Sequence, residues 1–269
     1  MRRGEVIVGT KTALVTGASK GIGRCYALQL AALGYNVLMV ASGETELLAT
    51  AEEVRTANPN VWVRTLVKDL ATSTAAEEVF AWTEAECIKV DVLINNAGIF
   101  SFCDILNTPI ERIQRMIYLH DITSTLNCRL YAADMIKRGG GRILNMSSFS
   151  IWMPYPGLSL YSASKAYLKS FSVAFSKEVE AKGVTVTAIC PAGIATDLYG
   201  LSPKLQRFGV RTGILMTPDS CARRSLRAMF RGTRCKVPDW WFRLFIPICQ
   251  LVRGPLMKWL RNFTMQFQK

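Results

Sequence analysis

Tyr161 and Lys165 lie four residues apart in a stretch, about residues 159–181, that is predicted to be a helix. This spacing puts both side chains on one helix face. A free tyrosine has a pKa of about 10, so it is a poor base at neutral pH unless a nearby cation stabilises the phenolate. We expect Lys165 to supply that cation and to lower the pKa of Tyr161. The pair is therefore a candidate for proton transfer to or from a bound molecule.

A glycine-rich turn near the N-terminus has the spacing of a nucleotide-binding loop. It runs Thr16-Gly17-Ala18-Ser19-Lys20-Gly21-Ile22-Gly23, after an apolar run at 12–16 and before a predicted helix at about 21–33. Glycine allows a tight turn and a close approach to a pyrophosphate, and the N–H groups at the start of the helix favour an anion. By itself, a glycine-rich turn is as often an ordinary loop as a nucleotide-binding one. With the downstream tyrosine and lysine, it predicts a dinucleotide site.

Strand-like and helix-like patterns alternate along the chain from residue 12 to about 190. The predicted strands are at about 12–16, 36–41, 61–66, 91–94, 141–146 and 184–190. Continuous apolar strands separated by helices indicate a parallel sheet covered on both faces. The expected fold class is α/β, a doubly wound Rossmann-type parallel sheet in a single domain, residues 1–235, followed by a basic amphipathic C-terminal tail, residues 236–269. The ligand crevice of such a sheet lies at the carboxyl ends of its strands, where every motif named here falls.

These motifs resemble those of the short-chain dehydrogenase/reductase family of classical type, over about residues 10–200. The resemblance rests on the glycine turn, Asp69 after the third strand, the turn Asn95-Asn96-Ala97-Gly98, Ser148, the Tyr161 and Lys165 pair, and Pro191, Gly193 and Thr196. The stretch 143–165 resembles reductases of lipid, steroid or 3-ketoacyl carbonyls.

The resemblance implies a catalytic role for Ser148, Tyr161 and Lys165. The tyrosine hydroxyl would pass a proton to or from the substrate oxygen, and Ser148 would hydrogen-bond that oxygen. Lys165 would also hold the nicotinamide ribose. Ser147 is the alternative to Ser148, because serine pairs after strands are common in turns. Tyr155 and Tyr167 are interpreted as packing residues.

His120 departs from the family pattern. Counting back from Ser148, it occupies the position where the resemblance implies a catalytic asparagine that helps to hold a water beside the lysine, and an alignment slip of one residue would place Asp121 there. A neutral imidazole could keep that hydrogen-bond chain, and its unperturbed pKa of about 6.5 predicts an acid limb in the activity. The alternative is that this single histidine only packs.

The resemblance also implies a set of cofactor-binding residues. They are Gly17, Ser19, Lys20, Gly21, Ile22, Gly23, Ser42, Asp69, Asn95, Ala97, Gly98, Tyr161, Lys165, Pro191, Gly193, Ile194 and Thr196. NAD enzymes of this architecture place an acid at the end of the second strand, whereas this strand ends Ala41-Ser42. Lys20 and Ser42 suit a 2′-phosphate, so NADP(H) is favoured and NAD(H) is the alternative.

The composition argues against a disulfide-linked, a metal-binding and a secreted protein. Half of the 269 residues are hydrophobic, which is enough for one large core, and eight cysteines without a C-x-x-C pair are interpreted as buried thiols and not as disulfides or metal ligands. One histidine and no clustered ligands predict no metal site. The start of the chain has no pattern of a signal peptide, so we expect a cytoplasmic protein.

The C-terminal quarter holds nearly all of the net charge. After residue 199 there are fourteen Lys and Arg and two Asp, a net +12 of the total +13. Residues 198–216 are predicted to form a lid. The apolar run at 244–252 is too short to span a bilayer and is interrupted by Pro247, but residues 237–261 suit peripheral membrane contact, with packing on the body or a dimer contact as the alternative. No nucleic-acid-binding module is recognised, so no nucleic-acid partner is expected.

The sequence therefore predicts an NADP(H)-dependent oxidoreductase acting on a carbonyl or secondary alcohol of a lipophilic substrate. The alternative is a non-catalytic Rossmann-fold cofactor sensor or interaction protein. The resemblance implies a homodimer or homotetramer formed by the helices predicted at about 109–136 and 159–181.

Overall fold

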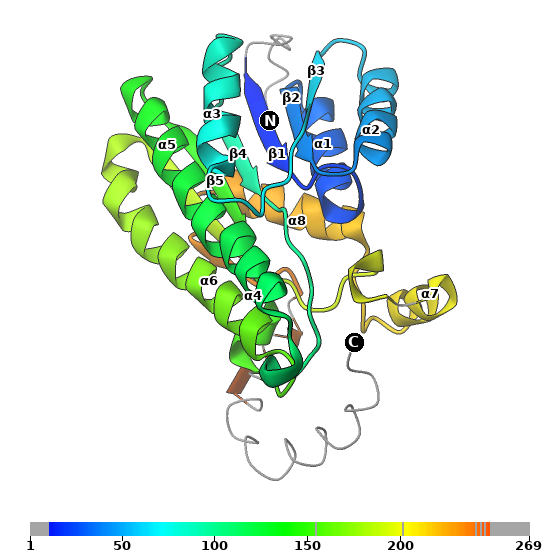
Figure 1. Ribbon diagram of the computed structural model, residues 1–269. Coiled ribbons are helices and arrows are strands. Elements are labelled where there is room, and N and C mark those ends of the chain that lie inside the picture. The colour runs from blue at the N-terminus through cyan, green and yellow to red at the C-terminus, as the bar shows by residue number, and fades with distance from the viewer. Residues whose placement is uncertain are drawn as a thin grey trace.

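The computed structural model describes residues 11–247, apart from 154, 201, 240, 243 and 245. The described strands form one parallel sheet in the order β3-β2-β1-β4-β5-β6-β7 (Figure 1). Their bounds are β1 Thr12–Thr16, β2 Asn36–Ala41, β3 Val63–Val67, β4 Val92–Asn95, β5 Gly141–Met146, β6 Val184–Ile189 and β7 Cys235–Lys236. The predicted doubly wound fold is confirmed.

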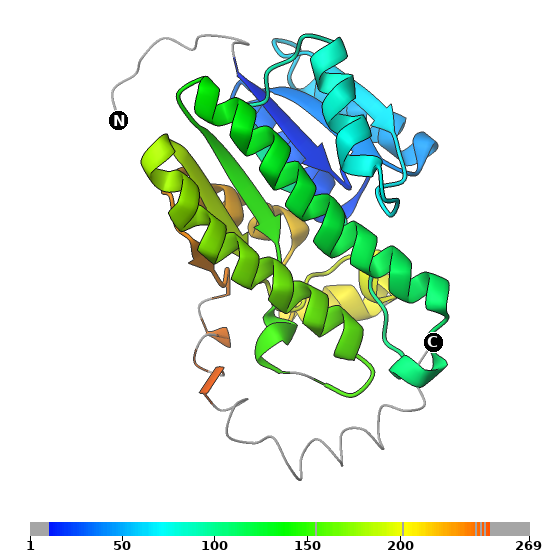
Figure 2. The same cartoon turned by 60° about the vertical axis from the view of Figure 1, so that its left-hand side comes forward.

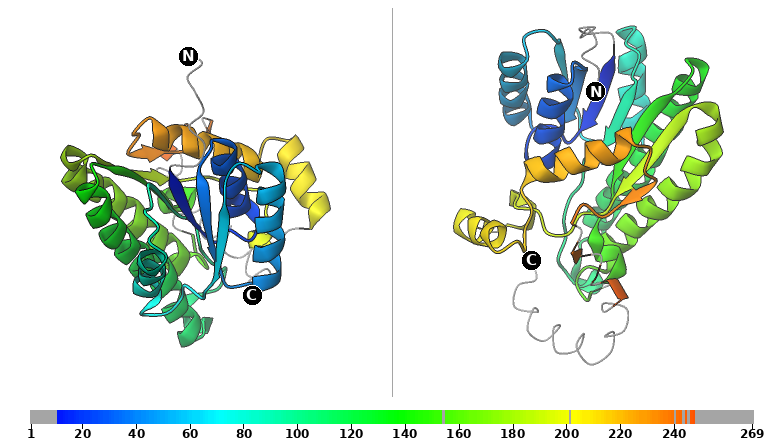
Figure 3. Two further views of the ribbon diagram at one scale, coloured as in Figure 1. Left: turned by 90° about the horizontal axis from the view of Figure 1, so that it is seen from above. Right: turned by 180° about the vertical axis from the view of Figure 1, so that it is seen from behind.

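Helices cover both faces of the sheet, as Figure 3 shows from above. On one face lie α1 (Gly21–Ala32), α2 (Glu44–Ala57) and α8 (Pro218–Phe230), which share an apolar core with the sheet. On the other lie α3 (Ala75–Ala85), α5 (Thr123–Lys137) and α6 (Ser159–Val179), which share a second core. β1 and β2 are buried at every residue, which explains why their sequences are mostly apolar, with polar residues only at the strand ends.

The structure departs from the predicted elements in three places. β3 begins two residues later than predicted, and β7 was not predicted at all because two residues carry no detectable pattern. The helix expected at 109–136 is α4 (Ile110–Ile117), a π-helical turn (Tyr118–Ile122) and α5, which Figure 2 shows as one long rod beside α6. Single π turns inside helices are often found at functional sites.

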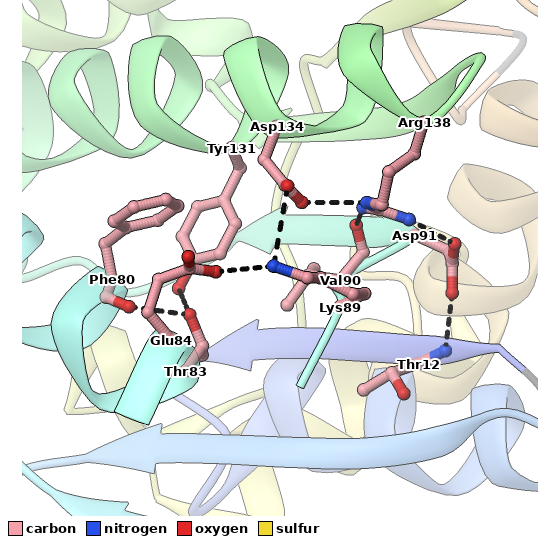
Figure 4. Close-up of polar contacts among 10 residues, drawn as sticks. All are labelled: Thr12, Phe80, Thr83, Glu84, Lys89, Val90, Asp91, Tyr131, Asp134 and Arg138. Atoms are coloured by element: carbon pink, nitrogen blue, oxygen red, sulfur yellow. Dashed lines mark hydrogen bonds and ion pairs between the residues drawn. The ribbon is translucent and has the colours of Figure 1, made fainter. Parts of the chain in front are cut away.

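Polar contacts join the elements at the amino ends of the strands, away from the motifs (Figure 4). Asp91 accepts a hydrogen bond from the backbone N–H of Thr12 at 2.8 Å, and it forms an ion pair with Arg138 at 3.0 Å. Arg138 also pairs with Asp134, which is 3.8 Å from Lys89. This cluster ties the start of β1 to the end of α5. Its ion pairs therefore lie at the amino ends of the strands, whereas the motifs lie at the carboxyl ends.

The described part of the tail lies on the body. β7 pairs with β6, Val237 is buried, and the ring of Phe242 lies 5.3 Å from that of Phe149. The lid predicted at 198–216 contains the short helix α7 (Pro203–Arg211). Within the described ranges, no helix is both long and apolar enough to cross a membrane. Most of the expected membrane segment, residues 248–261, lies outside the described residues.

Candidate active site

One cleft of about 1220 Å³ lies at the carboxyl ends of the strands. Most of the predicted cofactor residues line it: Gly17, Ser19, Lys20, Gly21, Ile22, Ser42, Asp69, Ala97, Gly98, Tyr161, Lys165, Pro191, Ile194 and Thr196. Ser148 lines it as well. The fold therefore gathers motifs that are far apart in the sequence, because the ends of parallel strands meet at one edge of the sheet.

The glycine turn is held too tightly for side chains. A Cβ on Gly23 would lie 2.0 Å from the carbonyl oxygen of Gly17, and Gly17 itself has a φ of +64°. Asn96 donates its side-chain amide to the carbonyl oxygens of Thr16 and Gly17 at 3.0 and 3.3 Å. The turn thus presents backbone to the cleft at the start of α1, which fits a bound pyrophosphate.

The end of β2 bears no acidic side chain that lines the cleft. Ser42 is exposed and lines the cleft with Lys20, whereas Glu44 and Glu46 do not line it. Arg24 also reaches this corner, where it pairs with Glu53. Lys20 has no ion pair with any residue that the structure describes, so its charge is available to an anion. These residues fit an adenosine 2′-phosphate better than a free 2′-hydroxyl.

Ser148, Tyr161 and Lys165 lie together at the opposite end of the cleft. Ser148 and Tyr161 both line the cleft, and the Ser148 hydroxyl acts on the Tyr161 hydroxyl so as to lower its pKa. Lys165 Nζ donates to the carbonyl oxygen of Met146 at 2.9 Å and lies 5.9 Å from the centre of the Tyr161 ring. Tyr161 and Lys165 come from one face of α6, and Ser148 follows β5, as predicted.

The pKa values in this group are set mainly by burial. Burial raises the pKa of the Tyr161 hydroxyl, and the Ser148 hydroxyl opposes part of the rise. Burial lowers the pKa of the Lys165 ammonium to about 8, against smaller opposing effects of Asp121 and Cys190. The expectation that Lys165 lowers the pKa of Tyr161 is wrong in this state, because the ammonium is turned to Met146. Tyr161 is a protonated phenol here and is suited to donate a proton.

Ser147 is engaged elsewhere. Its Oγ donates to the backbone carbonyl oxygen of Lys165 at 2.7 Å, which fastens β5 to α6. Ser148 Oγ is not bonded to α6 in this way; it accepts from the N–H of Ser150 at 3.1 Å and acts on the Tyr161 hydroxyl. The geometry therefore favours Ser148 over Ser147 for contact with a substrate oxygen.

His120 is fully buried in the π-helical turn and does not line the cleft. Its Nε2 accepts from the N–H of Ile99 at 3.0 Å, so Nδ1 carries the proton and donates to Ser164 Oγ at 2.9 Å. Burial and then Lys165 lower the pKa of His120 well below its ordinary value. The predicted acid limb with a pKa near 6.5 is therefore wrong: the imidazole is neutral and joins the turn after Gly98 to α6.

Asp121, the alternative to His120, is half-buried in the same turn. Burial raises the pKa of its carboxyl to about 6, and Lys165 opposes that rise. Its Oδ1 is buried without a hydrogen-bond partner among the described residues.

Three predicted cofactor residues, Gly23, Asn95 and Gly193, do not line the cleft. Asn95 is 3% exposed, donates to Asn145 Oδ1 at 2.8 Å and accepts from Asn127 at 3.1 Å. It holds β4, β5 and α5 together inside the core. Sequence reasoning missed its neighbour Asn96, which lines the cleft; the Asn-Asn doublet was visible, but nothing in it told the two side chains apart.

The substrate end of the cleft has an apolar wall. Phe100 lies edge-on to Tyr161 with ring centres 5.1 Å apart, and Leu198 lines the cleft from the lid. Tyr155 stacks on Phe102, and Tyr167 is exposed on α6 with a hydrogen bond to Thr125. Neither tyrosine lines the cleft, in agreement with their interpretation as packing residues.

The fold and the cleft define a nucleotide-binding α/β protein with a serine, tyrosine and lysine group at its reacting end. The sequence model of the short chain dehydrogenase family matches residues 11–204, and the chain belongs to this family.

Similar proteins are reductases. A 3-oxoacyl-[acyl-carrier-protein] reductase of Synechocystis is 36% identical over 70% of this chain and 76% of that protein. A very-long-chain 3-oxoacyl-CoA reductase of Coccidioides immitis is 34% identical over 66% of this chain and 51% of its own length. The chain thus spans about half the length of the fungal relatives that it matches.

Solved structures share the fold. A short-chain dehydrogenase from Sphingobium yanoikuyae in complex with NADPH has a TM-score of 0.77, with 28% identity over 91% of this chain and 96% of that one.

Proposed function

We propose that this protein is an NADP(H)-dependent oxidoreductase that interconverts a carbonyl and a secondary alcohol on a lipophilic substrate. The observation that carries the proposal is the placement of Ser148, Tyr161 and Lys165 in one cleft with the glycine turn. The alternative, a non-catalytic cofactor sensor, receives no support, because it would not require a serine, a tyrosine and a lysine together at the reacting end of the cleft.

The bound nicotinamide would supply or accept a hydride; the other steps belong to this chain. Ser148 binds the substrate oxygen through its hydroxyl, which orients the carbonyl. Tyr161 donates its phenolic proton to that oxygen during reduction, or accepts one during oxidation. Lys165 holds the ribose hydroxyls and stabilises the phenolate that remains after proton donation. Phe100 keeps water away from the Tyr161 ring.

The preference for NADP(H) over NAD(H) is supported by charge. A 2′-phosphate at the corner of Lys20 and Ser42 would meet one unpaired cation and one hydroxyl donor, and no carboxylate lines the cleft from the end of β2. The relative from Sphingobium yanoikuyae binds NADPH.

The lipophilic substrate class is supported by the apolar wall and by the names of relatives, which reduce 3-oxoacyl groups. For the assembly we propose a homodimer or homotetramer formed through α4, α5 and α6. Ile117 on α4, Ile122 in the π-helical turn and Tyr167 on α6 are each more than a third exposed. We further propose a cytoplasmic protein with peripheral membrane contact through residues 237–261.

The test is oxidation of NADPH, followed by absorbance, across a panel of 3-oxoacyl thioesters, steroid ketones and short polar ketones. We expect turnover of the apolar carbonyls. Tyr161→Phe should lower the turnover rate by at least ~10²-fold while NADPH binding stays near that of the wild type, because only the proton donor is lost. Wild-type turnover in the Phe variant would exclude the assigned mechanism, and no turnover of any carbonyl would favour the sensor.

The cofactor preference has its own test by calorimetry. NADPH should bind more tightly than NADH, and Lys20→Ala should narrow the difference, because the cation interacts with the 2′-phosphate alone. Equal affinities in the wild type would exclude the preference.

A further inference from the structure

The short helix α7 has an outward face that the proposed mechanism does not use. The helix lies beyond the carboxyl ends of the strands, at the edge of the body (Figure 1). Gly209 is its one buried residue. Leu205 and Phe208 are 55% and 62% exposed, and because they are three residues apart on a helix they form one apolar patch. Apolar side chains that lie next to each other in water indicate a contact surface.

The opposite side of α7 belongs to the cleft. Gln206 lines the cleft from the helix, and Leu198 lines it from the segment that precedes the helix. Gly209 packs so closely on Leu215 that a Cβ on the glycine would lie 2.6 Å from that side chain. Gln206 and Gly209 are also three residues apart, so they mark the inner side of the helix. The helix therefore forms part of the rim of the cleft and presents its apolar patch to the outside.

Positive charge borders this patch. Lys204, Arg207 and Arg211 are exposed, and residues 198–216 contain no Asp or Glu. None of the three cations forms an ion pair with a residue that the structure describes. Phe208 is four residues after Lys204 and three before Arg211, so both cations are its neighbours on the helix surface. The outward face of α7 is thus made by Lys204, Leu205, Arg207, Phe208 and Arg211.

This combination suits the surface of an anionic bilayer. A helix in the membrane interface buries apolar side chains below the headgroups, while long cationic side chains keep their stems with them and bring their charges to the lipid phosphates. An acidic protein surface would pair with the cations alone. The apolar patch therefore favours a bilayer as the partner.

We propose that the outward face of α7 is a membrane-binding surface that places the rim of the cleft on an anionic bilayer. It is separate from the membrane contact proposed for residues 237–261. Its use in substrate delivery rests on the proposed function: a lipophilic carbonyl dissolved in the bilayer would enter the cleft past Leu198, which lines it beside α7, without crossing water.

The test is sedimentation of the full chain with vesicles of phosphatidylcholine and phosphatidylserine. Leu205→Ser combined with Phe208→Ser should lower the partition coefficient at least about tenfold, because two apolar side chains no longer enter the bilayer. Arg207→Gln combined with Arg211→Gln should lower it by a similar factor, about tenfold, and should weaken the dependence on salt, because each cation contributes to the attraction of the leaflet.

Two matched pairs of substitutions serve as controls. Leu33→Ser with Leu48→Ser removes two exposed leucines at the end of α1 and on α2. Arg227→Gln with Arg231→Gln removes two exposed cations on α8 and at its end. Both control proteins should sediment nearly as the wild type does, because these side chains lie off the outward face of α7. Melting temperature and NADPH affinity identify any variant that is unfolded.

The outcomes decide the proposal. It is overturned if the wild type binds no vesicles, if both α7 pairs bind as the wild type does, or if the α8 pair weakens binding as much as the α7 arginine pair. A loss with the α7 arginine pair and none with the serine pair would exclude insertion and favour an acidic protein as the partner.

Folding and activity are kept apart from this result. If the double serine variant is unfolded, Phe208→Ser alone and the α7 arginine pair decide. Sedimentation needs no turnover, so failure to bind vesicles and failure to reduce any carbonyl are separate results, and only the second contradicts the proposed function.

Discussion

At the scale of single residues, burial decides the chemistry of the site more than the pairing of charges does. Lys165 was expected to lower the pKa of Tyr161, because the two side chains share one helix face. Instead both are buried, and each is shifted toward its neutral form. A protonated tyrosine next to a lysine of moderate pKa suits carbonyl reduction near neutral pH, where the phenol donates and the cation is still present.

The lowered pKa of Lys165 predicts a pH dependence for cofactor binding. The ammonium is charged below pH 8 and neutral above it, so NADPH affinity should fall as the pH rises through about 8. Asp121, His120, Tyr161 and Cys190 lie in the same field; of these, Asp121 titrates at about 6, well below this range. Lys165→Arg keeps its charge to higher pH, so its affinity should stay level.

The measurement is the dissociation constant of NADPH from pH 6 to 10 for both proteins, with melting temperature as a control. A wild-type affinity that is constant across this range would contradict the assignment of the charge to ribose binding.

At the scale of elements, the π-helical turn between α4 and α5 is the feature that brings His120 into the site. The turn directs the His120 ring toward Tyr161, at 6.0 Å between ring centres, and toward Ser164 on α6. Through Ile99 it also fixes the loop that carries Gly98 and Phe100.

This geometry predicts the behaviour of two His120 variants. His120→Leu removes the acceptor for the Ile99 N–H, and an unsatisfied buried donor costs about 1–3 kcal/mol, so turnover and melting temperature should both fall. His120→Asn keeps an acceptor and a donor and should retain most of the turnover. Because the imidazole is neutral, His120 should not contribute an acid limb to the rate between pH 5 and 9, and neither variant should change the shape of the pH profile in this range.

The measurement is the rate of carbonyl reduction from pH 5 to 9 for the wild type and the two variants. An acid limb in the wild type that disappears in His120→Asn would show that the histidine does titrate during the reaction.

At the scale of the whole molecule, positive charge is concentrated in the C-terminal quarter of the chain, which includes α7 and α8 as well as the tail. The net +12 after residue 199 contrasts with a nearly neutral remainder. Val237, Phe242 and Ile246 pack in one apolar cluster with Phe149, so a truncation that tests the tail has to keep the residues up to 247.

A truncation after Pro247 therefore tests the membrane proposal more cleanly than a longer one. The full chain should sediment with vesicles that contain phosphatidylserine, less so as salt is raised, and the truncated protein should bind them weakly. Vesicles of phosphatidylcholine alone are the control for charge. Equal sedimentation of the full chain and the truncated protein would show that the segment after residue 247 does not bind the membrane, and would contradict the proposal for that segment.

The sequence by itself determined the fold class, the strand order along the chain and the candidate residues Ser148, Tyr161 and Lys165. It could do so because buried strands are mostly apolar and because glycine spacing and an (i, i+4) pair are local signals. Only the tertiary structure showed that Ser147 is bonded to the backbone of Lys165, that Asn95 lies in the core and that His120 is buried. Each of these depends on which group from a distant segment lies within hydrogen-bond reach and on how much water is excluded, and neither quantity is encoded in local sequence spacing.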